Sequence, residues 1–426
     1  MRNPEFLALA SVNFASGMAF ATIIIALALY AEQYAVSGVV AGLFGTAYAV
    51  IRLFLVLPIG RYVDLGNPKR YLLAGMVLTV LVLLGFMNVG AASHVIALRA
   101  LQGAASITLL LAGTALVGQL AAEGERGLWL GTYKQASSFA SLSGDIAGGA
   151  MLFLFGFAPT YAALTVVVVL ATAMAYVFVR EDPGTSADAA EKTGLETLRL
   201  LMSRSAIKAL VFFRFSFSFG KMAVIIFLPI YARTEFGMSA LAIGGILAGG
   251  KLTKSVAQGY VGTLSDRIGH HEWFVFAGTI GYAVGTGMIP FAGYAAGVLP
   301  GVTLPVPGWV PGAEGAIDFH PAFFWLFTAY VILGIADSLR IPTSVAMFVE
   351  EGEHYGAVAG SLSLRSVSWQ VGAIVGPLAV GGMLDVMSFF EAFWLAAAFM
   401  IVAGTVFMYL YTAEPAPDTR PATADD

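Results

Sequence analysis

The sequence contains no cysteine and few charged side chains. Of its 426 residues, 11% are charged and 58% are hydrophobic. The absence of cysteine excludes disulfide bonds, thiol chemistry and cysteine-ligated metal sites. The mean hydropathy of +0.83 excludes an ordinary soluble domain. We therefore expect an integral membrane protein, in which the positions of the charges matter more than their sum of −4.

Residues that serve catalysis or nucleotide binding are also scarce. The five histidines lie in expected loops or at helix ends, with no acid or nucleophile at a spacing typical of a catalytic set. No glycine-rich loop precedes a Lys-Ser or Lys-Thr pair, and no nucleic-acid-binding motif is present. We expect a protein that is not an enzyme, without ATP coupling, cofactor, metal site or nucleic-acid partner.

Long apolar stretches dominate the chain. A helix needs about 20 mostly apolar residues to span a bilayer. The first stretch has no cleavage site after it and is interpreted as a membrane helix, not a signal peptide. Twelve membrane-spanning helices are predicted, at 6–30, 37–60, 71–93, 95–121, 127–155, 159–179, 206–231, 238–261, 273–295, 322–348, 355–384 and 389–411.

A polar motif occurs twice. Gly60–Arg70 (GRYVDLGNPKR) precedes Gly262–His271 (GTLSDRIGHH) by 262 − 60 = 202 positions, which aligns Asp64 with Asp266. Each copy is expected to form a short polar hairpin between two hydrophobic helices, and the repetition indicates a duplicated bundle. The predicted organisation is an all-α membrane protein with six-helix bundles at 1–180 and 206–412, a linker at 181–205 and a disordered tail at 413–426.

The positive charges of the loops favour one orientation. The outer loops would hold only Arg233, so both termini and the linker are predicted to be cytoplasmic. The linker segment LETLRLLMSR is expected to act as a tether or as an amphipathic helix on the inner surface. The Pro- and Gly-rich stretch 296–321 is expected to form an outer cap or spacer. The inner segments would hold Arg2, Arg61, Lys69, Arg70, Arg126, Arg180, Lys192, Arg199, Arg204, Lys208, Arg267 and Arg420.

These motifs resemble the major facilitator superfamily, whose signature loop reads Gly, three residues, Asp, a basic residue, one residue and Gly. The second copy fits with Gly262, Asp266, Arg267 and Gly269, whereas the first has Leu65 in the basic position. Arg99-Ala100-Leu101-Gln102-Gly103 is similar to the R-x-x-Q-G motif common among the family's drug and proton antiporters. The Gly-Pro-rich motif usually emphasised in helix 5 has its counterpart in helix 11, at Gly372, Gly376, Pro377, Gly381 and Gly382.

The resemblance implies two bundles that expose a central cavity alternately to each side. Because a carboxylate can accept hydrogen bonds from free N–H groups at a helix start, the motif residues are expected to favour one closed state. The predicted gate comprises Gly60, Asp64, Gly262, Asp266 and Arg267.

The predicted spans contain many more cations than carboxylates. A charge in the bilayer interior is costly, so these side chains must face a cavity or a partner. Asp145 and Asp337 are the carboxylates that clearly oppose them. Arg99 with Asp145, and Asp337 with Arg340, are each expected to serve as a buried pair or in ion coupling. The predicted substrate-binding cations are Arg214, Lys221, Lys251, Lys254, Arg340, Lys134, Arg52 and Arg365.

Helical spacing places several of these residues on common faces. One polar stripe joins Lys134, Ser138, Ser141 and Asp145. Two more are predicted on later helices, comprising Arg214, Ser218 and Lys221, and Lys251, Lys254 and Gln258. Three polar stripes on apolar helices indicate a water-filled cavity.

The leading hypothesis is a secondary transporter, a monomer in the plasma membrane, for a small anionic solute. The first alternative is a drug/proton antiporter centred on Arg99, Asp145 and Asp337. The second is a non-transporting receptor or lipid-moving protein on the same fold. A coupling proton or ion is left open.

Overall fold

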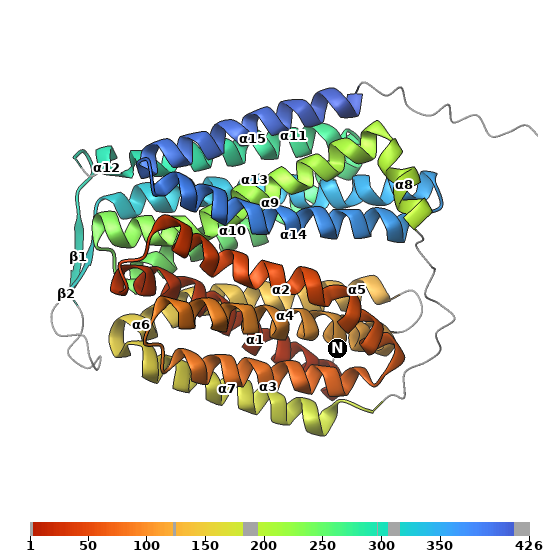
Figure 1. Cartoon of the computed structure of the whole chain (residues 1–426), viewed down its shortest axis with the longest axis horizontal. Coiled ribbons are helices and arrows are strands. Elements are labelled where there is room, and N and C mark those ends of the chain that lie inside the picture. Colours follow the sequence, from red (N-terminus) through yellow and green to blue (C-terminus); the bar gives the residue numbers. More distant parts are fainter. Residues whose placement is uncertain (1–2, 122–124, 182–194, 296, 306–315, 413–426) are drawn as a thin grey trace, which may run out of the picture.

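The computed structural model describes residues 3–121, 125–181, 195–295, 297–305 and 316–412. Within them the chain is almost entirely helical and forms two bundles that lie against each other (Figure 1). The first bundle runs from red to yellow in the figure and the second from green to blue, with α8 at the point where the chain enters the second bundle. The predicted tail lies outside the described residues, as do positions 182–194 of the linker.

The first bundle contains six membrane-length crossings. The fifth is interrupted by η1, a turn of π-helix, so that α5, η1 and α6 together make one crossing. The elements are α1 (Pro4–Gln33), α2 (Gly38–Leu65), α3 (Pro68–Phe86), α4 (Ala92–Leu120), α5 (Arg126–Ser143), η1 (Gly144–Gly148), α6 (Gly149–Phe155) and α7 (Phe157–Phe178).

The second bundle repeats this arrangement after the short helix α8 (Leu195–Ser203), which confirms that the LETLRLLMSR segment is helical. Eleven helices of the described chain are long and apolar enough to cross a membrane, and α10, diluted by its lysines, supplies a twelfth crossing of similar length. The elements are α9 (Ser205–Phe236), α10 (Ala240–Ile268), α11 (His271–Met288), η3 (Ile289–Phe291), α12 (Ala292–Ala295), α13 (Ala322–His354), α14 (Val358–Leu384) and α15 (Phe389–Thr412).

One boundary prediction was wrong, because the third helix ends at Phe86 and not at 93. The stretch 296–321 does lie between two helices, and its described residues form two short strands, β1 (Val302–Pro305) and β2 (Ala316–Phe319). The strands pair antiparallel, with Val302 opposite Phe319. Figure 1 shows this hairpin at the opposite end of the molecule from α8. We call these two ends the hairpin end and the linker end.

The duplicated motif is more helical than predicted. Helices α2 and α10 run through most of it, so Asp64 and Asp266 lie in their last turns instead of in a hairpin loop. Only the reversals are non-helical. Asn67 caps α3 by accepting a hydrogen bond from the Lys69 N–H (3.0 Å), and Gly269 ends α10 in the left-handed region at φ 78°.

The two bundles contact each other closely toward the hairpin end. Arg233 of α9 forms an ion pair of 2.5 Å with Glu32 of α1. Asp385, which follows α14, accepts hydrogen bonds from the first N–H groups of α2, at 2.5 Å for Gly38 and 3.2 Å for Val39. An aspartate at a helix start satisfies free donors there. These bonds join helices of opposite bundles.

The interruption of the fifth crossing is a second place where the bundles meet. The turn η1 packs against α10, and Gly149 lies so close to it that an added Cβ would come within 2.7 Å of the Ala240 carbonyl oxygen. Helix α14, which packs along α2, is also irregular because it contains Pro377, which cannot donate a backbone hydrogen bond.

Toward the linker end, large apolar side chains of the same helices are exposed. Phe54 and Leu57 of α2 are 71% and 81% exposed, and Val256 and Tyr260 of α10 are each 74% exposed. Inter-bundle hydrogen bonds and ion pairs of α2 and α10 among the described residues lie nearer the hairpin end. The contact between the bundles is therefore asymmetric along the long axis.

Candidate functional site

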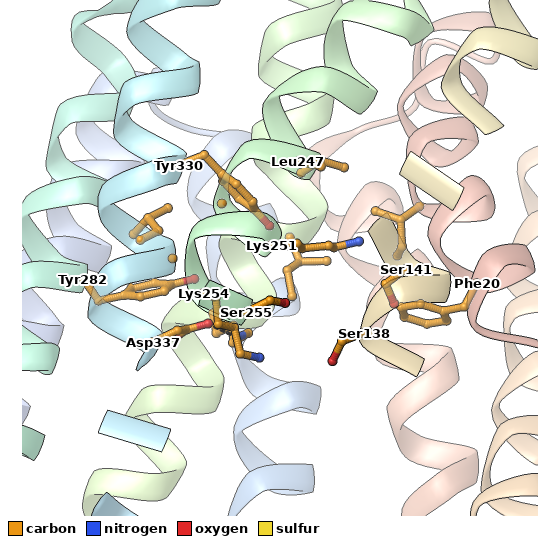
Figure 2. Close-up of a pocket in the computed structure, with 16 residues that line it drawn as sticks. Phe20, Ser138, Ser141, Leu247, Lys251, Lys254, Ser255, Tyr282, Tyr330 and Asp337 are labelled. Carbon is orange, nitrogen blue, oxygen red and sulfur yellow. Dashed lines mark hydrogen bonds and ion pairs between the residues drawn. The ribbon is translucent and has the colours of Figure 1, made fainter. Parts of the chain in front are cut away.

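A polar cavity lies where the two bundles face each other. It has two adjoining lobes, which share Phe20, Ser141 and Ile225. The lobe mainly within the second bundle, here the C lobe, has a volume of about 200 Å³. The lobe mainly within the first bundle, here the N lobe, has a volume of about 460 Å³. Figure 2 shows Phe20, Ser138 and Ser141 of the first bundle on one side of the C lobe and its lysines on the other.

One ion-pair cluster belongs wholly to the second bundle. Asp337 of α13 pairs with Lys221 of α9, and its other oxygen accepts hydrogen bonds from the Arg340 guanidinium at 3.0 and 3.2 Å. Arg340 is fully buried between two rings, 3.7 Å from the Phe217 centroid and 3.8 Å from that of Tyr282. The predicted Asp337–Arg340 contact is therefore present, with Lys221 as an additional partner.

A second ion pair crosses between the bundles. The Lys251 ammonium of α10 lies 2.7 and 2.8 Å from the two carboxylate oxygens of Asp145, in the π-turn η1. Asp145 is fully buried, whereas the Lys251 side chain is 30% exposed toward the C lobe. In Figure 2 the Lys251 side chain extends from α10 toward the side of the cavity that carries Ser141. Each bundle supplies one charge of this pair.

Lys254 differs from the other two lysines of the C lobe. It lines the cavity one turn from Lys251, yet it makes no ion pair or side-chain hydrogen bond with a residue that the structure describes. Asp337 lies close enough to attract this charge, but its oxygens are already paired with Lys221 and Arg340, so Lys254 has no ion-pair partner of its own. Asp337 is the one carboxylate among the residues lining this lobe.

The N lobe has cations but no carboxylate among its lining residues. The Arg52 guanidinium donates to the Tyr48 hydroxyl at 2.9 Å, and this hydroxyl lies 2.7 Å from the Ser106 hydroxyl. The Arg52 Nε is buried and has no hydrogen-bond partner in the described chain. Lys134 also lines the lobe and makes no ion pair there. Arg52 is thus held through one terminal nitrogen, while its enclosed Nε has no hydrogen-bond partner in the described chain.

Arg99 lies behind the N lobe. It is fully buried, donates to the Phe44 carbonyl at 2.7 Å and to the Gln102 side chain at 2.6 Å, and stacks 4.7 Å from the Tyr48 ring centroid. The predicted Arg99–Asp145 pair was wrong. Asp145 pairs with Lys251 of the opposite bundle, whereas Arg99 donates from Nε and one terminal nitrogen to backbone and amide oxygens and keeps its other terminal nitrogen buried without a partner in the described chain.

Three predicted substrate contacts do not line either lobe. Arg340 is enclosed as described above, and Arg214 lies 4.3 Å from the Trp369 ring centroid. Arg365 is half-buried, and its buried Nε has no hydrogen-bond partner in the described chain. The stripe of Arg214, Ser218 and Lys221 faces α14 for most of its length, because Ser218 donates to the Trp369 carbonyl at 2.6 Å. By contrast, Lys134, Ser138 and Ser141 do line the cavity as their spacing predicted.

The cavity also contains side chains that charge-based sequence analysis missed. Tyr282 and Tyr330 line the C lobe, and Tyr48, Trp369 and Gln370 line the N lobe. Neutral residues in apolar helices give little signal by themselves. For Tyr48 and Trp369 the available clue was their spacing of one helical turn from Arg52 and Arg365.

The predicted gate residues lie at the linker end. Asp64, Asp266 and Arg267 are exposed, and no hydrogen bond or ion pair joins their side chains to the described chain. An added Cβ would meet nothing within 4 Å at Gly262 and only a leucine methyl at Gly60. Their gating role stays a prediction.

The sequence matches the family model of the Major Facilitator Superfamily over residues 9–311 and 210–426, which together span nearly the whole chain. The chain belongs to the Major Facilitator Superfamily. It is therefore a multi-pass membrane transporter and not an enzyme, and the all-α fold with two bundles is confirmed.

Solved structures of other Major Facilitator Superfamily-type transporters share this fold. The nucleoside transporter NupG is 11% identical, with a TM-score of 0.75 over 96% of this chain and 99% of that one. A POT family transporter in complex with 5-aminolevulinic acid is 13% identical, with a TM-score of 0.73 over 96% of each chain. A bacterial homologue of the human lysosomal transporter Spinster, in an inward-facing and unoccupied conformation, is 12% identical, with a TM-score of 0.73 over 97% and 98%. At these identities the likeness concerns the fold.

Proposed function

We propose that this protein is a secondary transporter that carries a small organic anion across the plasma membrane by alternating access. The observation that carries the proposal is the charge of the cavity. Lys254, Lys134 and Arg52 face it without a carboxylate partner in the described chain. Charges inside a membrane protein require a partner or water. A substrate anion would serve as the partner of these three cations.

The chemistry of these cations suits carboxylate or phosphate groups. Arginine grips such groups through two parallel hydrogen bonds, whereas lysine acts as a mobile point charge. Lys221 and Lys251 are already paired with aspartates. An incoming anion must compete with these carboxylates, so we assign the first contact to Lys254 and to the N-lobe cations.

The asymmetric contact between the bundles supports alternating access. The ion pair of Glu32 with Arg233 and the bonds of Asp385 close the hairpin end, which we assign to the outside. The linker end, with its exposed side chains on α2 and α10, would then be the cytoplasmic mouth, with both termini on that side. We take the working unit to be a monomer.

A drug/proton antiporter is the second candidate, and the R-x-x-Q-G motif favours it. Asp145 and Asp337 are the buried carboxylates of the cavity region that could carry a proton, and each is paired with lysine. In that mechanism a lipophilic cation would have to displace a lysine. A receptor or lipid-moving role is the third candidate and requires no accumulation of a soluble solute.

Transport into proteoliposomes separates these functions. The purified protein is given radiolabelled organic anions and, separately, lipophilic cations, with and without a pH gradient. We expect accumulation of an anion that is abolished by the Lys221→Gln, Lys254→Gln double substitution. Lys208→Gln, at an exposed position of α9, is the matched control. Transport of lipophilic cations alone would overturn the anion proposal, and no accumulation of either class would favour the third candidate.

A further inference from the structure

The uncompensated cations of the two lobes are related by the duplication. Positions 52 and 254 differ by 202, the same offset that aligns the repeated motifs. Arg52 on α2 and Lys254 on α10 are therefore equivalent residues of the two bundles. One lines the N lobe and the other the C lobe.

Both residues lack a carboxylate partner in the described chain, although aspartates are close by. In the C lobe, Asp337 is occupied by Lys221 and Arg340, and Asp145 by Lys251. The N lobe has no acidic lining residue at all. Each lobe thus retains its own unmatched positive charge, and these charges belong to opposite bundles.

The N lobe is a built site and not a solvated surface. The Arg52 guanidinium donates to the Tyr48 hydroxyl at 2.9 Å, and that hydroxyl is itself held by the Ser106 hydroxyl at 2.7 Å. Arg52 lines the lobe, and a guanidinium held at one nitrogen can present its remaining N–H groups to a planar oxyanion. Lys134 adds a second, more mobile charge to the same lobe.

The boundary between the lobes has a different character. The lobes share Phe20 and Ile225, which are apolar, and the hydroxyl of Ser141. In Figure 2 the Phe20 ring lies across the C lobe from Lys254. A molecule that reached both cations would therefore lay its middle against apolar surface and its two ends against positive charge.

We propose that the substrate is an elongated solute with two anionic ends, such as a dicarboxylate or a phosphorylated carboxylate, and that Lys254 and Arg52 each hold one end. This inference rests on the proposed function and narrows it. A substrate held in this way contacts both bundles at once. Its binding therefore favours the relative position of the bundles in which both cations can reach it. A solute with one anionic end would leave one of the two equivalent cations unmatched.

The test compares unbranched dicarboxylates of increasing length with their half-esters of the same length, by thermal shift of the purified full-length protein. A ligand that binds the folded state raises the melting temperature with its concentration. We expect an optimum length at which the diacid binds about tenfold to a hundredfold more tightly than its half-ester, as expected for one additional charged hydrogen bond. Arg52→Gln and Lys254→Gln should each abolish this difference and still bind the half-ester, whereas Arg52→Lys should retain part of it.

The outcomes separate this inference from the function on which it rests. If half-esters bind as tightly as diacids and Arg52→Gln leaves the ratio unchanged, the two-ended substrate is refuted and a singly charged anion remains. If no anion of either kind stabilises the protein, the anion proposal itself falls. Lys208→Gln is the control for loss of an exposed positive charge, and a circular dichroism spectrum of each variant shows whether it is folded.

Discussion

The ion pair between Asp145 and Lys251 forms only while η1 of one bundle lies close to α10 of the other. Breaking it should therefore disfavour the conformation described here. Asp145→Asn removes one charge of the pair. Breaking a fully buried pair costs about 3–5 kcal/mol, and an exposed pair contributes about 0–1 kcal/mol. Since Lys251 is 30% exposed, we expect about 2 kcal/mol, which corresponds to a shift of roughly 30-fold away from the conformation described here.

The shift can be measured as a distance between spin labels at the linker end. Leu57→Cys on α2 and Val256→Cys on α10 place labels on exposed positions of opposite bundles. The chain has no cysteine of its own, so labelling is confined to these sites. In the background of Asp145→Asn we expect the distances to shorten, because loss of the pair lets the hairpin end open and the linker end close.

Asp337→Asn is the matched control. It removes a buried carboxylate of the same kind, but its partners Lys221 and Arg340 lie in its own bundle. It should therefore destabilise the protein without moving the labels. Exchanging the charges, by Asp145→Lys with Lys251→Asp, should restore the original distances. An unchanged distance distribution in Asp145→Asn would refute the assignment of this pair as an inter-bundle contact that favours the present state.

Three further changes have defined outcomes. Gly149→Ala should shorten the same label distances, because the added methyl group would press on a backbone carbonyl of α10. Asp385→Asn should also shorten them, because weaker hydrogen bonds to the start of α2 would disfavour the present conformation by about 1 kcal/mol. Unchanged distances would show that these hydrogen bonds do not hold the hairpin end closed. Phe217→Leu should lower the melting temperature, by loss of about 1–2 kcal/mol of stacking on buried Arg340, whereas Phe54→Leu, at an exposed position, should leave it unchanged.

The sequence was sufficient for the architecture because the bilayer limits the possibilities. A stretch of about 20 apolar residues in this setting forms a helix, and the duplicated motif indicated how the helices are grouped. The predicted helix ends were misplaced where polar side chains were taken to mark the end of a helix. The backbone of α2 continues through Tyr62 and Asp64, since a helix satisfies its own hydrogen bonds whether or not its side chains are charged.

The site was predicted in part, for a related reason. The rule that buried charges face water or a partner located the cavity, and the four- and three-residue spacing of Lys134, Ser138 and Ser141 identified a face that lines it. The spacing of residues along one helix cannot show which residue of another helix forms an ion pair with a given charge. Asp145 pairs with a lysine 251 − 145 = 106 residues away on another helix, and a ring enclosure such as that around Arg340 depends on aromatic residues from two helices.

The irregular turns of α14 and of the fifth crossing have a mechanical consequence. The segment Gly144–Gly149 (GDIAGG) aligns with Gly372–Pro377 (GAIVGP) at an offset of 372 − 144 = 228. The first segment forms a π-turn within its crossing, the second places a proline inside the continuous helix α14, and each lies in a helix that packs on the opposite bundle. Because a π-turn and a proline each break the regular backbone hydrogen-bond pattern, we expect the helices to bend at these points. We expect these two points to define a hinge line across the molecule, about which one bundle could rotate as a rigid body to open the hairpin end and close the linker end without unpacking either bundle.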